Sequence, residues 1–394
     1  MKDSRKDDKL KKHRRLFAPI VAWPNLLLAT QLARRGKPES AARHRFHFHL
    51  EAELLRLHRE LTDGSYRPGP YRAFRIHDPK ERLISAAPYR DRVVHHALCN
   101  VIEPIFEQTF VSDSYANRKG KGTHQGINCY QKLSRRFPYV LKCDVRKFFP
   151  SLDHLILKKI IRRKIGCQAT LQLIDRIIDN SNPQEEHFAY FPGDDLFTPH
   201  ERRRGLPIGN LTSQCWANVY LNAFDHFVKI TLRAPGYLRY VDDFVLFADS
   251  KEQLWQWKRD IEAYLAGLRL MLHPHKTQVY CVADGVPFLG FQVWPYYRMV
   301  QKSKVKRFRR HLRRQVRSMQ TGRLHPDRLE AMLNSWLGHI RFGQSRRLEK
   351  QVFNELHQLG VMVAIHPKGS WRVLERPRRD RSHPVPKIGI KIGA

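Results

Sequence analysis

Two short apolar runs, residues 237–241 and 244–247, flank a pair of adjacent acidic residues. Both runs are rich in aromatic and branched side chains, so they predict the two strands of a hairpin. Asp242 and Asp243 then fall at its turn. Two like charges side by side repel each other and add nothing to a sheet. A divalent cation bound by both carboxylates is the economical explanation for the pair.

Elsewhere the apolar pattern predicts helices mixed with short strands. Helices are predicted at residues 23–61 (broken at 36–38), 93–110, 251–269 and 302–323. Strands are predicted at residues 139–143, 270–282 and 288–293. A chain of 394 residues can bury a large core, and we expect more than one domain.

Two loops rich in turn residues interrupt this pattern. Residues 205–214 lead into a helix, and residues 114–126 are rich in Gly and Lys. The amides and cations of the second loop suit a phosphate group, and a solvated linker is the equally weighted alternative. The candidate cations for nucleic-acid contacts in this loop are Arg118, Lys119 and Lys121.

The charge balance indicates the kind of partner. The chain has 72 Lys and Arg against 37 Asp and Glu, a formal net charge of +35. Self-repulsion of this size costs stability, so an anionic partner is expected. Nucleic acid fits better than an acidic membrane, because several stretches mix Arg with aromatic rings that can stack on bases. No run reaches the ~18 apolar residues of a membrane span, so we expect a cytoplasmic protein with no membrane partner.

One stretch concentrates the positive charge. Residues 285–326 contain no acidic residue. Repeated like charges one turn apart destabilise a helix, so a solvated helix face does not explain this run. A separate helical module that grips a phosphate backbone is the better interpretation. Its candidate contacts are Lys302, Lys306, Arg309, Arg310, Arg313 and Arg314.

Both ends of the chain are expected to be tails. Residues 1–22 begin with a basic segment and continue into an apolar stretch that superficially resembles a signal peptide. Pro19, Pro24 and Asn25 interrupt that stretch, so a turn and a packed helix are the better interpretation. Residues 367–394 are rich in Pro, Arg and Gly and show no core pattern.

The cysteines and histidines do not indicate a metal centre. The six cysteines are scattered without a CxxC pair, which favours reduced, buried thiols. His44, His47, His49 and His58 lie close in sequence, but an Arg-rich helix surface is the better interpretation than a zinc site.

A third carboxylate strengthens the hypothesis of a cation at the hairpin. Asp144 follows the predicted strand at 139–143, so it would lie at the sheet edge. With the hairpin pair it could hold two Mg²⁺ ions, Mn²⁺ being the alternative ion. One ion would lower the pKa of a primer 3′-hydroxyl, and the other would neutralise charge on a triphosphate and its leaving pyrophosphate. Taken alone, Asp144 would be interpreted as the cap of the following helix.

From residue 23 to about residue 342 the chain resembles a reverse transcriptase. The segment Tyr240-Val241-Asp242-Asp243 matches the YxDD box of that family, and Asp144 matches its first catalytic aspartate. The resemblance implies that the three aspartates are catalytic and bind the metal ions, helped by the carbonyl of Val145. It implies an α+β right-hand polymerase with fingers, a palm containing an antiparallel sheet, and a helical thumb.

The resemblance also divides the chain and assigns roles. The implied parts are a basic tail (1–22), fingers with the start of the palm (23–138), the palm (139–300, with a fingers insertion at about 155–204), a basic helical thumb (301–366) and a C-terminal tail (367–394). Nucleotide-binding positions correspond to Lys80, Arg82, Phe149, Ile208, Gly209, Gln214 and Lys276. The primer grip corresponds to Phe288, Leu289 and Gly290. Phe149 would be a steric gate under the sugar, with a core aromatic as the alternative.

The loop at 205–214 indicates a subfamily. Ile208-Gly209-Asn210-Leu211-Thr212-Ser213-Gln214 is similar to the diversity-generating retroelement reverse transcriptases, as are segments near residues 23–26, 33–37 and 114–126. The resemblance implies error-prone cDNA synthesis (mutagenic retrohoming) from a structured RNA template, an RNA or DNA primer and dNTPs. It further implies an accessory variability-determinant protein, a basic helical oligomer. An aliphatic Ile208 cannot make the hydrogen bonds of the Gln found in other families, so checking of base-pair geometry should weaken.

The motifs also allow other functional interpretations. A group II intron-like or phage-defence reverse transcriptase shares parts of them, although the chain lacks the DNA-binding and endonuclease regions of mobile introns. With no acidic cluster after the thumb, an RNase H domain is not expected. An RNA-binding scaffold that retains a polymerase fold is the non-enzyme alternative, and the intact set of aspartates argues against it.

Overall fold

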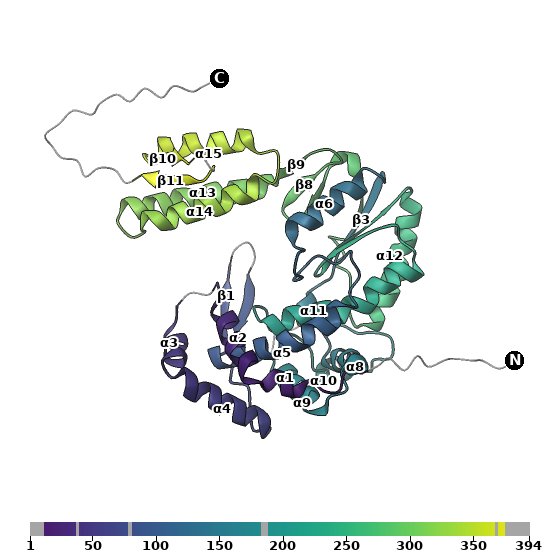
Figure 1. The fold of residues 1–394 in the computed structure, drawn as a ribbon. Coiled ribbons are helices and arrows are strands. Elements are labelled where there is room, and N and C mark those ends of the chain that lie inside the picture. The colour runs from purple at the N-terminus through teal and green to yellow at the C-terminus, as the bar shows by residue number, and fades with distance from the viewer. Residues whose placement is uncertain (1–11, 37–38, 78–80, 183–187, 367–368, 375–394) are drawn as a thin grey trace. The chain divides into compact units, whose positions relative to one another are not determined.

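The chain folds as two compact units, Met1–Val282 and Ala283–Ala394. The computed structural model describes residues 12–36, 39–77, 81–182, 188–366 and 369–374 (Figure 1). The predicted α+β class is confirmed, since both units combine helices with antiparallel strands. Among the described residues, no helix is long and apolar enough to cross a bilayer.

The first unit is built from helices, a four-stranded sheet and a separate hairpin. Its helices are α1 (Phe17–Val21), α2 (Trp23–Arg34), α3 (Ala41–Phe48), α4 (Leu50–Thr62), α5 (Tyr89–Glu107), α6 (Thr123–Ser134), α7 (Phe148–Ser151), α8 (His154–Lys164), α9 (Gln168–Asp179), α10 (Thr198–Glu201), α11 (Leu211–His226, continued by a π-helical turn, Phe227–Thr231) and α12 (Lys251–Gly267). Its strands are β1 (Arg72–Ile76), β2 (Arg82–Ala86), β3 (Tyr139–Asp144), β4 (Gly236–Tyr240), β5 (Asp243–Ala248) and β6 (Gln278–Cys281).

The four-stranded sheet has the order β4-β5-β3-β6, and every neighbouring pair is antiparallel. Helix α6 packs on β4, and α12 packs on β3 and β5 (Figure 1). Because residues 244–247 are all fully buried, β5 appears in the sequence as an unbroken apolar run rather than as an alternation. The hairpin predicted around Asp242 and Asp243 is confirmed as β4 and β5.

Local sequence signals account for several helix starts in this unit. Asp153 caps α8, where its side chain accepts a hydrogen bond from Ile156 N at 2.9 Å. Ser250 caps α12 in the same way through Gln253 N, at 3.2 Å. Pro24 lies in the first turn of α2, where its missing N–H costs nothing.

The predicted N-terminal tail is too long. Residues 1–11 lie outside the described residues, but the segment that follows is part of the fold. His13 N donates to Lys164 O at 2.9 Å, and Gly166 N donates to His13 O at 2.8 Å. Ile20 on α1 is fully buried. The apolar stretch after the basic start is therefore the first part of the core. Burial of its apolar side chains stabilises α1, although this helix is short.

The second unit contains a three-stranded sheet, three helices and a hairpin. A 3₁₀ turn at Val282–Asp284 leads into β7 (Val286–Phe288), β8 (Phe291–Val293) and β9 (Arg298–Val300). The helices are α13 (Lys302–Gln320), α14 (Pro326–Ile340) and α15 (Arg346–Gln358), and the hairpin is β10 (Met362–Ile365) with β11 (Trp371–Leu374). The predicted boundary at residues 300/301 differs from this division, because the β7–β9 sheet folds with the helices that follow it.

The predicted C-terminal tail begins too early. Trp371 is 1% exposed and exchanges two hydrogen bonds of 2.7 Å with the side chain of Asn334 on α14. Strand β11 is therefore part of the second unit, and residues 375–394 lie outside the described residues. Two buried side chains in a segment rich in Pro, Gly and Arg are too few to form a recognisable pattern.

Cysteines and the histidines near residue 47 have ordinary structural roles. All six cysteines are free, and Cys99, Cys143, Cys167 and Cys215 are buried, as predicted. His47 hydrogen-bonds to Tyr89 Oη at 2.8 Å.

Candidate active site

Three aspartates meet at one end of the four-stranded sheet. Asp144 is the last residue of β3 and lies directly opposite Asp243, the first residue of β5. Asp242 occupies the two-residue turn between β4 and β5. The backbone fixes this arrangement: Val145 N donates to Asp242 O at 3.2 Å, and His273 N donates to Asp144 O at 2.7 Å. The aspartates that the sequence predicts are thus brought together.

Asp242 and Asp243 lie in an environment that disfavours their charge. Burial, together with the charges of Asp243 and Asp144, raises the pKa of Asp242 to about 7. Burial also raises the pKa of Asp243 to about 6; Lys142 opposes this rise, and the neighbouring Asp144 adds to it. A cation bound between the carboxylates would remove both penalties.

The donor chemistry fits a hard divalent cation, although the side chains are not yet arranged around one. Carboxylate and carbonyl oxygens are the ligands that Mg²⁺ and Mn²⁺ prefer. In the part of the chain that the structure describes, no group of three or more His, Cys, Asp or Glu side chains is arranged to hold a metal ion. The Lys276 ammonium instead donates to Asp144 Oδ2, which places this predicted nucleotide-binding residue at the aspartates.

The loop at 205–214 is attached to the β1–β2 hairpin. Ser85 N on β2 donates to Ile208 O at 3.1 Å. The Asn210 side chain donates to Ser85 O at 3.0 Å and accepts from Ala87 N at 3.4 Å. Gly209 has a φ of 109°, which a residue with a side chain rarely adopts. Asn210 thus fixes the position of Ile208, a role that its sequence neighbourhood gave no reason to expect.

The same loop also contacts the residue predicted as a steric gate. Leu206 N donates to Phe149 O at 2.9 Å, so the loop and α7 are joined next to the end of β3. The Phe149 ring is partly buried, packs against the core and contacts Phe148 edge-on, with ring centroids 5.5 Å apart. Both roles predicted for Phe149 therefore remain predictions.

The other predicted nucleotide-binding residues are more scattered. Arg82 is exposed at the start of β2, and Lys80 lies outside the described residues. Gln214 is exposed in the first turn of α11.

The Gly- and Lys-rich loop uses one of its cations internally. The Arg118 side chain is 7% exposed and donates to Glu107 Oε1 at 2.7 Å, to Val111 O at 2.6 Å and to Ser114 O at 2.9 Å. It therefore holds the loop in shape rather than facing solvent. Lys119 is exposed and free to meet an anion from solvent.

The third predicted cation of this loop is half-buried. The Lys121 ammonium donates to Ser112 O at 2.9 Å and lies 4.8 Å from the ring centroid of Tyr115. Of the three predicted cations, Lys119 is therefore the one best placed for a phosphate.

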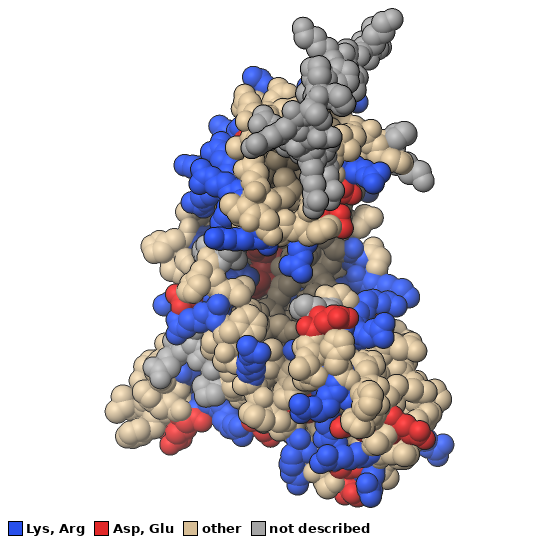
Figure 2. Space-filling view, turned by 90° about the vertical axis from the view of Figure 1, so that its left-hand side faces the viewer, with Lys and Arg blue, Asp and Glu red and all other residues tan. Residues whose placement is uncertain are grey.

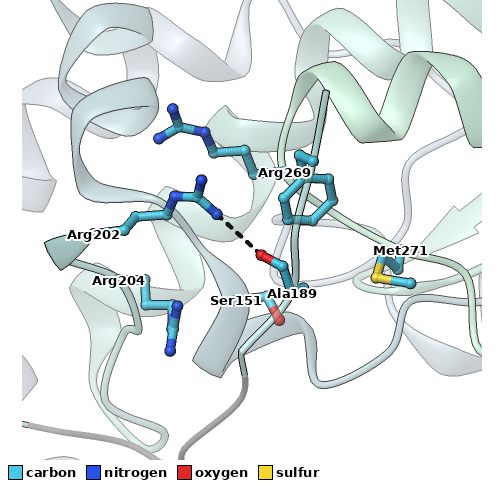
Figure 3. A pocket seen from close by; sticks show the side chains of 7 residues that line it. Ser151, Ala189, Arg202, Arg204, Arg269 and Met271 are labelled. Atoms are coloured by element: carbon cyan, nitrogen blue, oxygen red, sulfur yellow. Dashed lines mark hydrogen bonds between the residues drawn. The ribbon is translucent and has the colours of Figure 1, made fainter. Parts of the chain in front are cut away.

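Seven residues surround a small pocket in the first unit, including three arginines (Figure 3). Its volume of about 10 Å³ is about enough for one water molecule and far too small for a nucleotide. Arg269 donates to the buried Asp153 at 2.6 Å, and Arg202 donates to Ala189 O at 3.4 Å. The pocket is therefore a structural ion-pair cluster. Its lining residues are Ser151, Ala189, Phe191, Arg202, Arg204, Arg269 and Met271.

The three residues predicted as the primer grip lie at the turn of the β7–β8 hairpin, and their role stays a prediction. Phe288 pairs with Phe291, and Leu289 and Gly290 between them have φ values of 44° and 93°. The φ of Gly290 is one that residues with a side chain rarely adopt, so the position favours glycine.

A basic groove runs along α13 in the second unit. It has a volume of about 720 Å³ and faces α15. Lys and Arg side chains are also abundant on the molecular face shown in Figure 2, where Asp and Glu are fewer. Five of the six predicted thumb contacts line this groove, namely Lys302, Lys306, Arg309, Arg310 and Arg313.

Two of these arginines share a buried acidic partner. Arg309 and Arg313 donate to opposite oxygens of Glu355 on α15, at 2.5 and 2.7 Å. Glu355 is 5% exposed. The remaining residue of the predicted set, Arg314, contacts His311 at 3.1 Å. The sequence pattern makes the arginines look equivalent, whereas the structure distinguishes Arg309 and Arg313, which bind Glu355, from the exposed Arg310 and Arg314.

Comparison with known proteins shows which family the chain resembles. The family model described as "Reverse transcriptase (RNA-dependent DNA polymerase)" matches residues 76–293, more than half of the chain. The matched region contains Asp144, Asp242 and Asp243, and it ends before α13.

Three curated proteins illustrate the similarity. Protein YkfC of Escherichia coli is 27% identical over 289 residues, covering 62% of this chain and 72% of that protein. The group II intron-encoded protein LtrA of Lactococcus lactis is 25% identical over 181 residues, covering 45% of this chain and 28% of LtrA. The putative COX1/OXI3 intron 1 protein of Saccharomyces cerevisiae is 23% identical over 295 residues, covering 61% of this chain. The chain spans 28% and 34% of the lengths of the two intron-encoded relatives.

Proposed function

The chain belongs to the reverse transcriptase (RNA-dependent DNA polymerase) family, and on that premise we propose that its polymerase site is the aspartate cluster at the end of the sheet. Asp144, Asp242 and Asp243, with the carbonyl of Val145, would hold two Mg²⁺ ions, Mn²⁺ being the alternative. The observation that carries this proposal is the direct pairing of Asp144 with Asp243 beside the turn that presents Asp242. When bound, the two ions would activate the primer 3′-hydroxyl and neutralise the triphosphate.

The surrounding residues support binding and placement of the substrates. Lys276 is already at Asp144 and can neutralise an anion there. Arg82, Ile208 and Phe149 belong to the elements that join next to the aspartates, so they are proposed to contact the incoming nucleotide. Phosphoryl transfer depends mainly on placement and charge compensation, which these groups can supply.

Primer extension on an RNA template tests the site. We expect Asp243→Asn to abolish Mg²⁺-dependent DNA synthesis, because the neutral amide removes a metal ligand while keeping the side-chain shape. A loss on the order of 10²- to 10³-fold in kcat is expected, the size found when one group that stabilises transition-state charge is removed. Asp249→Asn is the matched control, because Asp249 is exposed just after β5. Equal extension by wild type and Asp243→Asn would refute the site, and no extension by either protein would favour the RNA-binding scaffold.

We further propose that the enzyme makes error-prone cDNA, as in diversity-generating retroelements. Ile208 supports this proposal: its backbone is bound to β2, and its side chain has no hydrogen-bonding group to offer a base pair. The proposed partners are a structured RNA that serves as template, with an RNA or DNA primer, and an accessory variability-determinant protein. If that protein is required, the purified chain alone will make little cDNA on its own RNA.

Sequencing of the cDNA tests fidelity. We expect wild type to misincorporate more often opposite template adenine than opposite other bases. Ile208→Gln should lower that error rate, because the amide can hydrogen-bond near the nascent pair. Ile208→Leu, which stays apolar, should leave the error rate unchanged.

The similarity to intron-encoded proteins favours a second candidate, a group II intron-like reverse transcriptase. The same sequencing distinguishes the two. Uniformly low error at all four template bases would refute the retroelement proposal and support the intron-like enzyme.

A further inference from the structure

Arg239 is a charged residue in the middle of β4, and its side chain is fully buried. Its Nε and Nη2 donate to the two carboxylate oxygens of Asp225 on α11, at 2.7 and 2.6 Å. Asp225 accepts a third hydrogen bond from Tyr237 Oη at 2.6 Å. Burying an ion pair carries a large desolvation cost, and apolar side chains of similar size often stabilise a fold better. Stability alone therefore does not explain the pair.

The remaining nitrogen of Arg239 reaches the turn that carries Asp242. Nη1 donates to Val241 O at 3.1 Å and to Asn218 Oδ1 at 3.2 Å. Because Asp225 binds the other side of the guanidinium, the direction of Nη1 is fixed. A planar group with several donors can hold both partners at once, and a lysine ammonium cannot do so with the same geometry.

Val241 needs such a restraint. Its φ of 58° lies in the left-handed region, which β-branched residues rarely adopt because it is strained for them. Such a conformation persists only where its surroundings impose it. Val241 directly precedes Asp242, so its backbone angles decide where that carboxylate points.

The backbone of Arg239 joins the same turn to the Gly- and Lys-rich loop. Arg239 N donates to Asp113 O at 2.9 Å, and Tyr115 N donates to Arg239 O at 2.9 Å. The Asn218 side chain donates to Ala116 O at 2.9 Å. One residue thus connects the loop, α11 and the aspartate turn.

We propose that Arg239, held in place by Asp225, is a positioning residue that keeps the Val241–Asp242 turn in the conformation needed to bind metal. The inference rests on the proposed Mg²⁺-dependent polymerase site. It predicts that loss of the Arg239 geometry weakens Mg²⁺ binding and lowers kcat, whereas dNTP binding is unaffected.

The main test compares Arg239→Lys with wild type in two measurements. The first is the Mg²⁺ concentration that gives half of the Mg²⁺-induced rise in melting temperature, without nucleic acid. The second is primer extension, giving kcat, the dNTP KM and the Mg²⁺ half-saturation. We expect Arg239→Lys to need about 10- to 100-fold more Mg²⁺ and to lose kcat by a similar factor, with the dNTP KM unchanged.

The matched control is Arg202→Lys, which alters another buried Arg–Asp contact of the first unit. The Arg202 side chain is 4% exposed and pairs with Asp194, and both residues belong to the segment between α9 and α11 rather than to the Val241–Asp242 turn. It should lose melting temperature like Arg239→Lys but keep the wild-type Mg²⁺ response. If Arg239→Lys fails to fold, the neutral pair Asp225→Asn with Arg239→Gln removes both charges together and answers the same question.

The outcomes are distinct. A destabilised Arg239→Lys that keeps the wild-type Mg²⁺ half-saturation and kcat would overturn the inference and leave the pair a structural one. A wild-type protein that neither extends primers nor responds to Mg²⁺ would overturn the proposed function itself, and the inference with it.

Discussion

Burial disfavours the charged form of a titratable side chain, so it raises the pKa of an acid and lowers the pKa of a base. At the aspartate cluster, burial raises the pKa of Asp242 to about 7. A cation bound there would stabilise the ionised carboxylate that burial disfavours. His95 on α5 shows the other case. Burial, with the positive charges of His96 and Arg92 nearby, lowers its pKa to about 3, so it is a neutral core residue at physiological pH.

His95 should make stability depend on pH. The pKa of His95 in the folded chain is lower than its value of 6.5 in the unfolded chain. Below pH 6.5 the unfolded chain therefore binds a proton at His95 that the folded chain does not bind. Stability is therefore lost as pH falls from 6.5 toward 3. The contribution between pH 7 and pH 5 is about 2 kcal/mol. Urea denaturation at both pH values should show a smaller loss for His95→Gln than for wild type.

An exposed histidine provides the control for this pH effect. His77 is exposed after β1, so His77→Gln should keep the wild-type difference between the two pH values. An equal loss in His95→Gln and wild type would show that His95 is not the group responsible.

Some residues of the site could be predicted from sequence, and others could not, for a physical reason. Asp242 and Asp243 stand out because charge is out of place between two apolar strands. Asn210 and Arg239 act through partners 125 and 14 positions away, Ser85 and Asp225, which no local pattern links to them. Arg239 did carry a signal, a charge inside an apolar strand, but its meaning depends on Asp225.

At the scale of the element, the arginines of α13 fall into two pairs with different surroundings. Arg309 and Arg313 bind Glu355, so they connect α13 to α15. Arg310 and Arg314 are exposed one turn apart. A run of basic residues suggests a single phosphate-binding face. The sequence pattern of α13 could not show that two of its arginines bind Glu355 on another helix.

The salt dependence of RNA binding should separate these pairs. Replacing Arg310 and Arg314 together with Gln should reduce the slope of log K against log salt by about 1.5, because two phosphate contacts are lost. Replacing Arg309 and Arg313 with Gln should change the slope less. It should lower the melting temperature more, since Glu355 is left buried and unpaired. Equal slopes in wild type and the Arg310/Arg314 variant would mean that these side chains do not contact RNA.

For the whole molecule, the sequence predicted the fold class better than it predicted the boundary between the two units. The α+β class is confirmed because strong apolar runs such as residues 244–247 become buried strands. The division fell at Val282/Ala283 rather than at 300/301, since the short strands β7–β9 bury their apolar faces within the second unit. Domain limits depend on which faces pack together, and that is a property of the folded chain.

Strand β4 lies at one end of the four-stranded sheet, and the contact between its Arg239 backbone and residues 113–115 has a consequence for solubility. An exposed edge strand is a template for pairing with another molecule. Here the outward N–H and C=O groups at the middle of β4 are already used by the chain itself. An incoming strand would have to displace that segment first, so this rim of the sheet is protected against fibre-like self-association.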